Sequence, residues 1–400
     1  MTEYLNIVSE SDCTGCGACS AICPKKCISL IEDQQGFPMP MVDLDKCINC
    51  GLCKKTCPVL NSQTSSQEIL PIKVVAAKNA DSETVSKSSS GGIFSLLAQF
   101  VLTSQGSVYG VRLSPSLNAE HIRIDDIRQL GLLQGSKYLQ SDASKIYKSV
   151  KADLNSERLV LYSGTPCQIG ALHQYLGKDY SNLICVEVIC HGVPSNLAFK
   201  KYIDYLEDKH KEKICSINFR DKKNGWENYR VTFTFKNGSC FSQKSSDNLY
   251  TLGYVNNLFV RESCTACKFK GLRSNADFTL GDMWGIESII PSYNVSNGVS
   301  MISVNTPKGE AIFNQVQHLL KDCIEIKYDD VKLHNACIYK SVTPHPKRTY
   351  VLNNLQIYSI HKLIKESLGI TALTIIKKQY TILKNNVIQS LIGIKHKLLK

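Results

Sequence analysis

The sequence predicts an α+β or mixed α/β protein in three parts. A small cysteine-rich domain at 1–62 is followed by a larger domain of mixed sheet and helices at 70–345 and a helical extension at 346–400. Three observations predict this organisation: a repeated cysteine motif near the N-terminus, apolar strand-like runs that lead into helical spacing, and a long apolar stripe at helical spacing near the C-terminus. A chain of 400 residues is long enough for two or three domains.

The composition limits the class of protein. Hydrophobic residues make up 43% and charged residues 20%, as in globular proteins. We expect no membrane span, no signal peptide and a cytoplasmic location, so the 18 cysteines indicate metal ligation or redox chemistry rather than disulfides. Residues 361–400 hold eight Lys and one Glu, a net charge of +7 out of +12. The remaining +5 is spread over 360 residues and does not indicate a nucleic-acid binder.

The N-terminal domain contains the same motif twice. Residues 13–24 read CTGCGACSAICP and residues 47–58 read CINCGLCKKTCP, so both runs are C-x2-C-x2-C-x3-C-P. In proteins with two 4Fe-4S clusters, the first three cysteines of such a run bind one cluster and the fourth binds the other. The ligands predicted for the two clusters are Cys13, Cys16, Cys19 and Cys57, and Cys47, Cys50, Cys53 and Cys23.

The alternative for these cysteines is a pair of zinc sites, but zinc usually takes cysteines in pairs rather than in two identical runs of four. Gly17 and Gly51 follow the second cysteine of each run and let the backbone approach a cluster closely. Cys27 lies outside the pattern, and we expect it to be a small buried residue. The segment resembles a bacterial-type dicluster ferredoxin domain, whose function is electron transfer.

The larger domain begins after a polar linker at 61–70. A buried strand is predicted at Ile72–Ala77, followed by the loop KSSSGG at 87–92 and a helix at Ile93–Leu102. A serine–glycine loop before a helix offers free N–H groups to an anion, although a serine-capped helix without a ligand fits equally. The segment QGSKYLQS at 134–141 suits contact with a planar polar ring and also suits an ordinary turn.

Two further predicted strands, Arg158–Ser163 and Leu183–Ile189, each deliver a cysteine just beyond their ends. The four cysteines concerned, two single residues and one downstream C-x2-C pair, are Cys167, Cys190, Cys264 and Cys267. Their number fits a third tetrathiolate site for a 4Fe-4S cluster or for zinc. A redox-active C-x2-C pair and two buried structural cysteines are the alternatives.

Six motifs now occur in order: KSSSGG, QGSKYLQS, GTPCQ at 164–168, CHGVPS at 190–195, CTACKF at 264–269 and ADFTLGDMWG at 276–285. Together they resemble the beta subunit of coenzyme F-420-reducing hydrogenases and formate dehydrogenases, over about residues 72–340. The resemblance implies non-covalent FAD, hydride chemistry at the flavin, and a third 4Fe-4S cluster bound by the four cysteines above. It also implies a set of cofactor-binding residues: Ser88, Ser89, Ser90, Gly91, Gly92, Ser136, Lys137, Tyr138 and Thr165.

In that set the loop Ser88–Gly92 is expected to contact the flavin phosphate. Lys137 is expected to contact the isoalloxazine ring, where a cation stabilises the reduced flavin. The family pattern is weaker between 205 and 260, where Arg220, Lys222 and Trp226 lie. They either grip an anionic or aromatic substrate or form a solvated hairpin with one packed Trp.

Three other residues keep two interpretations each. Asp282 and Trp284 either serve the site or form a tight structural turn. His191, next to Cys190, either donates a proton near the flavin or hydrogen-bonds around a ligand.

The C-terminal extension predicts a basic amphipathic helix, because apolar residues from Leu373 to Leu398 recur at steps of three and four. This helix docks on the protein's own core, or it contacts a partner or a membrane surface. The tail lies outside the family resemblance.

The function expected is that of an iron–sulfur flavoprotein oxidoreductase. Electrons would pass between an external carrier, such as ferredoxin or a partner redox subunit, the clusters and FAD, and a hydride would be exchanged with a small molecule or a deazaflavin coenzyme. No nucleic-acid partner is expected. The alternative is an electron-transfer or redox-responsive subunit of a larger complex, linked for example to surface-polysaccharide synthesis.

Overall fold

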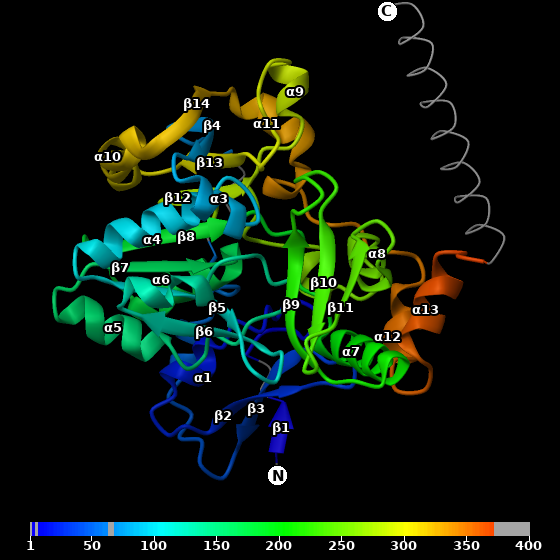
Figure 1. The fold of residues 1–400 in the computed structure, drawn as a ribbon. Helices are drawn as coiled ribbons and strands as arrows, with labels where there is room; N and C mark the ends of the chain where they lie inside the picture. The colour runs from blue at the N-terminus through cyan, green and yellow to red at the C-terminus, as the bar shows by residue number, and fades with distance from the viewer. Residues whose placement is uncertain (1, 5–6, 63–67, 372–400) are drawn as a thin grey trace, which may run out of the picture.

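The structure is a computed structural model that describes residues 2–4, 7–62 and 68–371. The described residues form three sheets, of three, eight and three strands (Figure 1). The mixed α/β class expected from the sequence is confirmed. No helix among the described residues is both long and apolar enough to cross a membrane. The amphipathic helix predicted from Leu373 to Leu398 lies outside the described residues.

The N-terminal domain is a small antiparallel sheet with two short helices beside it. Its elements are β1 (Thr2–Tyr4), β2 (Ile28–Glu32), β3 (Pro38–Asp43), α1 (Ala18–Ile22) and α2 (Leu52–Lys55), with strand order β1-β3-β2. Each helix starts directly after the glycine of one cysteine run, at Gly17 and Gly51, with φ of 79° and 71°. That left-handed conformation favours glycine, so the repeat in the sequence produces a repeated loop-and-helix unit.

The eight-stranded sheet has the order β14-β4-β13-β12-β8-β7-β5-β6. Its strands are β4 (Lys73–Asn79), β5 (Ser107–Leu113), β6 (Ala119–Ile124), β7 (Val160–Gly164), β8 (Leu183–Val188), β12 (Phe278–Asp282), β13 (Ser300–Val304) and β14 (Leu320–Glu325). Strands β5, β7, β8 and β12 are parallel, and the remaining pairs are antiparallel. The predicted strands at 72–77, 158–163 and 183–189 correspond to β4, β7 and β8.

Helices cover both faces of this sheet. The helices of this region are α3 (Ser82–Lys87), α4 (Ile93–Thr103), η1 (Ile127–Leu132), α5 (Tyr147–Asn155), α6 (Pro166–Leu176), η2 (Glu262–Cys264), α9 (Ile286–Ile289), α10 (Pro307–Val316), η3 (Gln317–Leu319), α11 (Tyr328–His334) and η4 (Ala336–Ile338). In β7, Leu161 packs with α4 on one face, whereas Val160 and Tyr162 pack with α5 and α6 on the other. This period of two explains why the strands are apolar throughout.

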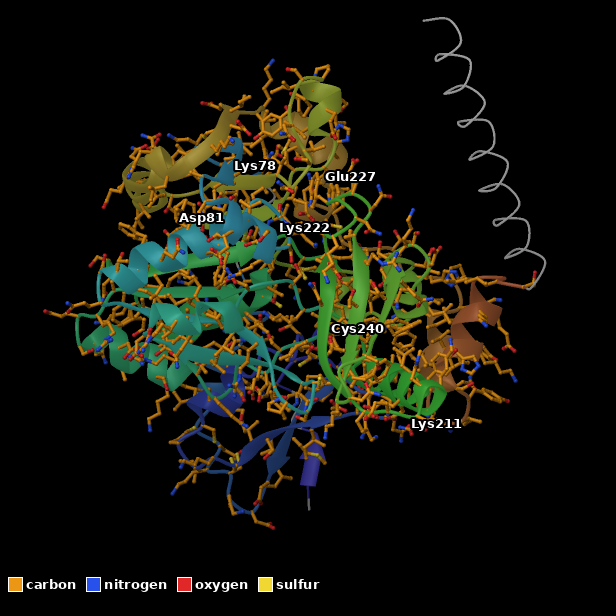
Figure 2. All side chains as sticks on the ribbon, in the orientation of Figure 1. Lys78, Asp81, Lys211, Lys222, Glu227 and Cys240 are labelled. Atoms are coloured by element: carbon orange, nitrogen blue, oxygen red, sulfur yellow. The ribbon has the colours of Figure 1, made fainter. Side chains whose placement is uncertain are left out.

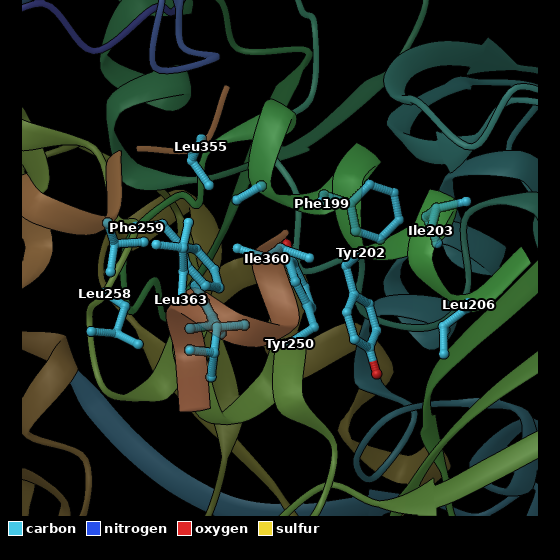
Figure 3. Close-up of a cluster of buried hydrophobic side chains, with 14 of the residues drawn as sticks. Phe199, Tyr202, Ile203, Leu206, Tyr250, Leu258, Phe259, Leu355, Ile360 and Leu363 are labelled. Carbon is cyan, nitrogen blue, oxygen red and sulfur yellow. The ribbon is translucent and has the colours of Figure 1, made fainter. Parts of the chain in front are cut away.

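A second layer stands beside the sheet. It consists of β9 (Ile214–Asp221), β10 (Arg230–Phe235) and β11 (Cys240–Lys244), with α7 (Asn196–His210), α8 (Leu249–Val255), α12 (Arg348–Asn353) and α13 (Ile360–Ser367). Its core contains Phe199, Tyr202 and Tyr250 from α7 and α8, and Ile360 and Leu363 from α13 (Figure 3). Helices α12 and α13, within the predicted C-terminal extension, therefore pack on α7 and α8.

Candidate functional site

The first cysteine set comprises the thiols predicted to bind one cluster: Cys13, Cys16, Cys19 and Cys57. All four line one cavity of the N-terminal domain, together with the backbone of Gly15 and Gly17. Burial is the main cause that raises the pKa of Cys16, to about 11, and the thiols of Cys13 and Cys57 raise it further. At neutral pH such thiols lose their protons only when a metal centre takes the place of the protons. Binding of a metal centre at this set is therefore coupled to proton release.

The second cysteine set comprises Cys23, Cys47, Cys50 and Cys53. These thiols line a second cavity of about 380 Å³, which also contacts Ile48 and Leu52. Cys27 borders the same cavity. Its burial, expected from the sequence, is confirmed at 5% exposure, and its Sγ lies 3.3 Å from the Sγ of Cys23. A fifth thiol therefore adjoins this set, a detail that the motif did not indicate.

The third cysteine set comprises Cys167, Cys190, Cys264 and Cys267, from separate places in the larger domain. Cys167 follows β7 at the start of α6, Cys190 follows β8, and the pair lies on and after η2. Burial raises the pKa of Cys167 well above its usual value, and the thiols of Cys267, Cys190 and Cys264 raise it further. The chain thus brings these four thiols together at the carboxyl ends of parallel strands, where α/β sheets usually place ligands.

Backbone and cationic groups surround the third cysteine set. The backbone N–H of Val193 donates to Sγ of Cys264 at 3.4 Å. The ammonium of Lys270 donates to the backbone carbonyls of Cys190 and Cys337, and its charge opposes the effect of burial on the pKa of Cys190, which is raised to about 12. Lys270 is thus the cation in direct contact with the backbone of this set. Lys270 was missed because nothing in its local sequence marks it.

The first and third cysteine sets meet across the boundary between the two domains. Arg261 is buried and donates to the carbonyls of Cys13 at 2.7 Å and Pro38 at 2.6 Å. The Gln140 amide donates to the carbonyl of Thr14 at 2.9 Å. Because Arg261 lies three residues before Cys264, the loop that carries the first set is held directly against the segment that carries the third.

Two tyrosines occupy the space between these sets. The hydroxyl of Tyr147 donates to the backbone carbonyl of Cys16 at 2.9 Å. Burial raises the pKa of Tyr162 well above its usual value, and the thiols of Cys16 and Cys167 both add to this shift. The ring of Tyr162 is held in place by His121, which stacks on it with centroids 5.3 Å apart.

The serine–glycine loop, Ser88–Gly92, connects α3 to α4. Gly92 precedes α4 with φ 83°, and a Cβ at Gly91 would lie 2.6 Å from the carbonyl oxygen of Ala77, so the loop fits closely over β4. Ser89 Oγ accepts from the backbone N–H of Ser136 at 2.7 Å. The two polar segments predicted to bind cofactor, 87–92 and 134–141, are therefore neighbours in space.

Within the second of these segments, Lys137 turns toward its own loop. Its ammonium donates to the carbonyls of Gln134 at 2.8 Å and Leu133 at 3.0 Å. Burial lowers the pKa of Lys137 to about 7. The residue thus has an ammonium that gains or loses its charge near neutral pH.

The segment where the family pattern weakens contributes charged side chains to the same region. Arg220 is buried, forms an ion pair with Asp282 at 3.0 Å and stands 4.0 Å from the ring centroid of Tyr229. Lys222, at the tip of the β9 strand (Figure 2), donates to the carbonyls of Val85, Ser90 and Asn297. Arg220 also donates to the carbonyl of Ser89 at 3.5 Å, so both cations contact the serine–glycine loop.

The two tryptophans of the chain pack together beside these cations. Trp226 and Trp284 stack with centroids 4.4 Å apart and planes 8° apart, and Trp226 Nε1 donates to Asp282 Oδ1 at 3.1 Å. Asp282 thus joins Arg220 to the tryptophan pair, which links the hairpin to the turn after β12.

Tyr254 and Tyr138 connect the third cysteine set to the serine–glycine loop. The thiols of Cys190 and Cys264 help to raise the pKa of Tyr254, of which burial is the main cause. The ring of Tyr254 lies 5.5 Å from that of Tyr138. The Tyr138 hydroxyl accepts from Arg220 at 3.4 Å, so packed side chains lead from the thiols to the loop.

Buried polar atoms without a partner gather at the same places. Of eight such side-chain atoms in the described part of the chain, three adjoin the cysteine sets (Thr14 Oγ1, Tyr162 OH and Ser263 Oγ) and two adjoin the serine–glycine loop (Asn79 Nδ2 and Arg220 Nε). Orphaned buried groups in native proteins call for a missing partner. The donors therefore fit sulfide-rich clusters at the first location and a polar, anionic group at the second.

The structure also places the remaining predicted residues. Thr165 Oγ1 lies 3.3 Å from Sγ of Cys167, beside the third cysteine set. His191 contacts Asn257 Oδ1 at 2.6 Å and Cys337 Sγ at 3.6 Å.

Among residues 2–4, 7–62 and 68–371, no three His, Cys, Asp or Glu side chains are grouped closely enough to hold a single metal ion.

Comparisons with known proteins address both domains. Residues 12–61 match the family model of the 4Fe-4S dicluster domain. Residues 157–329 match the family model for the C terminus of the beta subunit of coenzyme F420 hydrogenase/dehydrogenase. The latter range contains all of the third cysteine set and does not include the serine–glycine loop.

Comparisons over the whole chain are less specific. No curated protein matches the chain. A chain of the F420-reducing [NiFe] hydrogenase complex from Methanosarcina barkeri is similar at 14% sequence identity and a TM-score of 0.45, over 76% of this chain and 91% of that one. On the two family models, the chain joins a 4Fe-4S dicluster domain to the C-terminal region of the coenzyme F420 hydrogenase/dehydrogenase beta-subunit family, and so has a role related to oxidoreductases.

Proposed function

We propose that the chain is an iron–sulfur flavoprotein oxidoreductase that relays electrons from the dicluster domain, through a third 4Fe-4S cluster, to FAD. One observation carries the proposal: residues in contact lead from the first cysteine set through Arg261 to the third, and then through Tyr254 and Tyr138 to the serine–glycine loop. Three contacts of this route, from Arg261 to Cys13, from Tyr254 to Tyr138 and from Arg220 to Tyr138, join segments that are far apart in the sequence.

Within this route each group has a chemical task. The thiolates of the third cysteine set would hold the additional cluster, and Lys270 would offset part of its negative charge. Bound FAD would supply the exchange between single electrons and a hydride. The loop N–H groups before α4 would face its phosphates, with Arg220 and Lys222 fixing the loop.

The hydride acceptor or donor is an organic molecule or a deazaflavin coenzyme. Arg220 is the buried cation best suited to bind this molecule. Its terminal nitrogens contact Asp282 and Tyr138, but its Nε has no hydrogen-bond partner among the described residues. A planar anionic substrate would supply that partner. The partner that exchanges single electrons would be a carrier protein or a redox subunit.

Cofactor content tests the proposal. Anaerobically purified protein is expected to contain about twelve iron atoms and about twelve sulfides, since a 4Fe-4S cluster holds four of each, together with one FAD. Reduced methyl viologen should then bleach the flavin as well as the clusters. About eight iron atoms in protein that binds FAD would mean that the third cluster does not exist. About twelve iron atoms in protein without any affinity for flavin would mean that the chain is an electron-transfer subunit only.

A further inference from the structure

The second cysteine set contains a more exposed cysteine than the first, and its cavity reaches the protein surface there. Cys50 is exposed, whereas Cys13 and Cys57 of the first set are buried. In the relay proposed above, the second set is therefore the entry point, and the first lies inward against Arg261. Electron transfer falls steeply with distance, so a carrier protein must contact the surface around Cys50.

Exposed apolar side chains lie at this opening. Ile48 and Leu52 line the cavity and are 57% and 37% exposed. Large apolar side chains grouped on a surface mark contact sites more often than scattered ones do. The opening thus offers a small apolar centre to another protein.

The charges of the domain are sorted around the same opening. Residues 1–62 hold five lysines and seven acidic residues, a net charge of −2. All five lysines nevertheless lie in the segments that supply the second cysteine set: Lys25, Lys26, Lys46, Lys54 and Lys55. Lys46 is paired with Asp43 at 2.5 Å. The other four, called here the lysine rim, are exposed and form no ion pair with any described residue.

Lys25 and Lys54 line the cavity itself, from opposite cysteine runs, so the rim stands on both sides of it. Five of the seven acidic residues lie outside these segments, at Glu3, Glu10, Asp12, Glu32 and Asp33. A domain with a net negative charge therefore gathers its unpaired lysines beside the second cysteine set. Opposite charge on a partner would orient it toward Cys50 during encounter.

We propose that the lysine rim and its apolar centre dock an acidic one-electron carrier protein. This inference rests on the proposed relay and names its external partner. In each encounter the reduced carrier loses one electron and the protein gains one, with no bond made or broken and no proton moved. Electron-transfer encounters of this kind use small interfaces, held mainly by charge, that release quickly.

The test uses the full-length holoprotein and two reductants in stopped-flow experiments. One is a reduced plant-type [2Fe-2S] ferredoxin with a strongly acidic surface. The other is the methyl viologen radical, a small cation. For the wild type, the second-order rate constant with ferredoxin should fall at least fivefold between low and high ionic strength, because salt screens opposite charges. The rate with viologen should stay level or rise.

Charge reversal sharpens the test. The double variant Lys54→Glu/Lys55→Glu should slow reduction by ferredoxin at least tenfold at low salt and leave reduction by viologen unchanged or faster. The matched control is Lys321→Glu, an exposed lysine on β14 at the far side of the molecule (Figure 1), which should change neither rate. If the first variant lacks iron, the double variant Lys25→Glu/Lys26→Glu, on the other cysteine run, takes its place. It should show the same slower reduction by ferredoxin.

The two proposals fail differently. If viologen reduces the bound flavin but both double variants accept electrons from ferredoxin at the wild-type rate, the docking surface is wrong and the relay stands. If neither reductant delivers electrons to the flavin through the clusters, the relay itself is wrong.

Discussion

The hydroxyl of Tyr147 donates a 2.9 Å hydrogen bond to the backbone carbonyl of Cys16, across 131 positions of sequence. Through this contact, helix α5 of the larger domain reaches into the loop that carries the first cysteine set. Ala18 of α1 is fully buried in the same core as Tyr147. The dicluster domain is therefore fixed to the larger domain rather than tethered by the linker alone.

Tyr162 provides the first prediction. Its hydroxyl is buried between Cys16 and Cys167 beside the hydroxyl of Tyr147, and no contact among the described residues gives it a hydrogen bond of good geometry. We expect it to donate to a cluster sulfur, which stabilises the reduced state. Tyr162→Phe should lower the midpoint potential of one cluster by roughly 30–60 mV, a threefold to tenfold change in its reduction equilibrium. The measurement is a redox titration followed by electron paramagnetic resonance.

The control for this experiment is Tyr175→Phe, which removes a hydroxyl from the ring stacked on the other side of Tyr147, 5.4 Å away. It should leave every midpoint potential unchanged. Equal potentials in wild type and Tyr162→Phe would mean that the Tyr162 hydroxyl contacts no cluster.

Arg261 provides a prediction about stability. In Arg261→Met, the carbonyls of Cys13 and Pro38 lose a charged donor while they remain at the domain boundary. The free energy of unfolding should fall by about 2–4 kcal/mol, because an unsatisfied buried acceptor costs about 1–3 kcal/mol. Denaturant titration under anaerobic conditions measures it. Arg128→Met, at a side chain that is 86% exposed, should change it by less than about 0.5 kcal/mol.

The serine–glycine loop provides a prediction about flavin affinity. Ser89→Asp puts a negative charge where we propose the FAD phosphates bind, so FAD affinity should fall at least tenfold while iron content stays constant. Fluorescence titration of flavin-free protein measures the affinity. Ser86→Asp, on the exposed side of α3, is the matched control. Unchanged affinity in Ser89→Asp would place the phosphates elsewhere.

Gly92 would be a poor choice for the same test. Its φ of 83° strains any L-amino acid that replaces it, whether or not a ligand binds there. A loss of FAD in a Gly92 variant would therefore not separate charge repulsion from a distorted backbone.

Lys137 provides a prediction about pH. Burial lowers its pKa to about 7, so its positive charge is present below that pH and lost above it. If the ammonium faces an electron-rich flavin edge, FAD affinity should decline as the pH rises from 6 to 8. Lys137→Arg, which stays charged, should show a flat profile, as should the weaker-binding Lys137→Met. If the FAD affinity of the wild type also did not change with pH, Lys137 would not contact the flavin.

Much of the fold was predictable because its signals are local. The cysteine runs, the apolar strands at β4, β7 and β8, and the helix after Gly92 each occupy a short continuous stretch. The class of the larger domain followed from these strands. The second layer around β9–β11 was not predicted, because its core joins α7 and α8 to α13 across more than 100 residues.

The contacts that join the sites were less predictable. Arg261 reaches Cys13 over 248 positions, and Tyr254 reaches Tyr138 over more than 100. No local pattern marks such pairs. For Arg220 and Trp226 the sequence favours neither substrate contact nor a solvated hairpin. In the structure they are 6% and 1% exposed, and both contact Asp282, which comes from a distant strand.

The central claim is that electrons reach FAD through the third cysteine set, and Cys264→Ser tests it most directly. Its matched control is Cys240→Ser, at an exposed cysteine of β11 that belongs to none of the three sets (Figure 2). In Cys264→Ser, reduced viologen should still reduce the dicluster domain at the wild-type rate, and reduction of FAD through it should slow at least tenfold. If FAD is instead reduced at the original rate, the third cysteine set does not lie on the path.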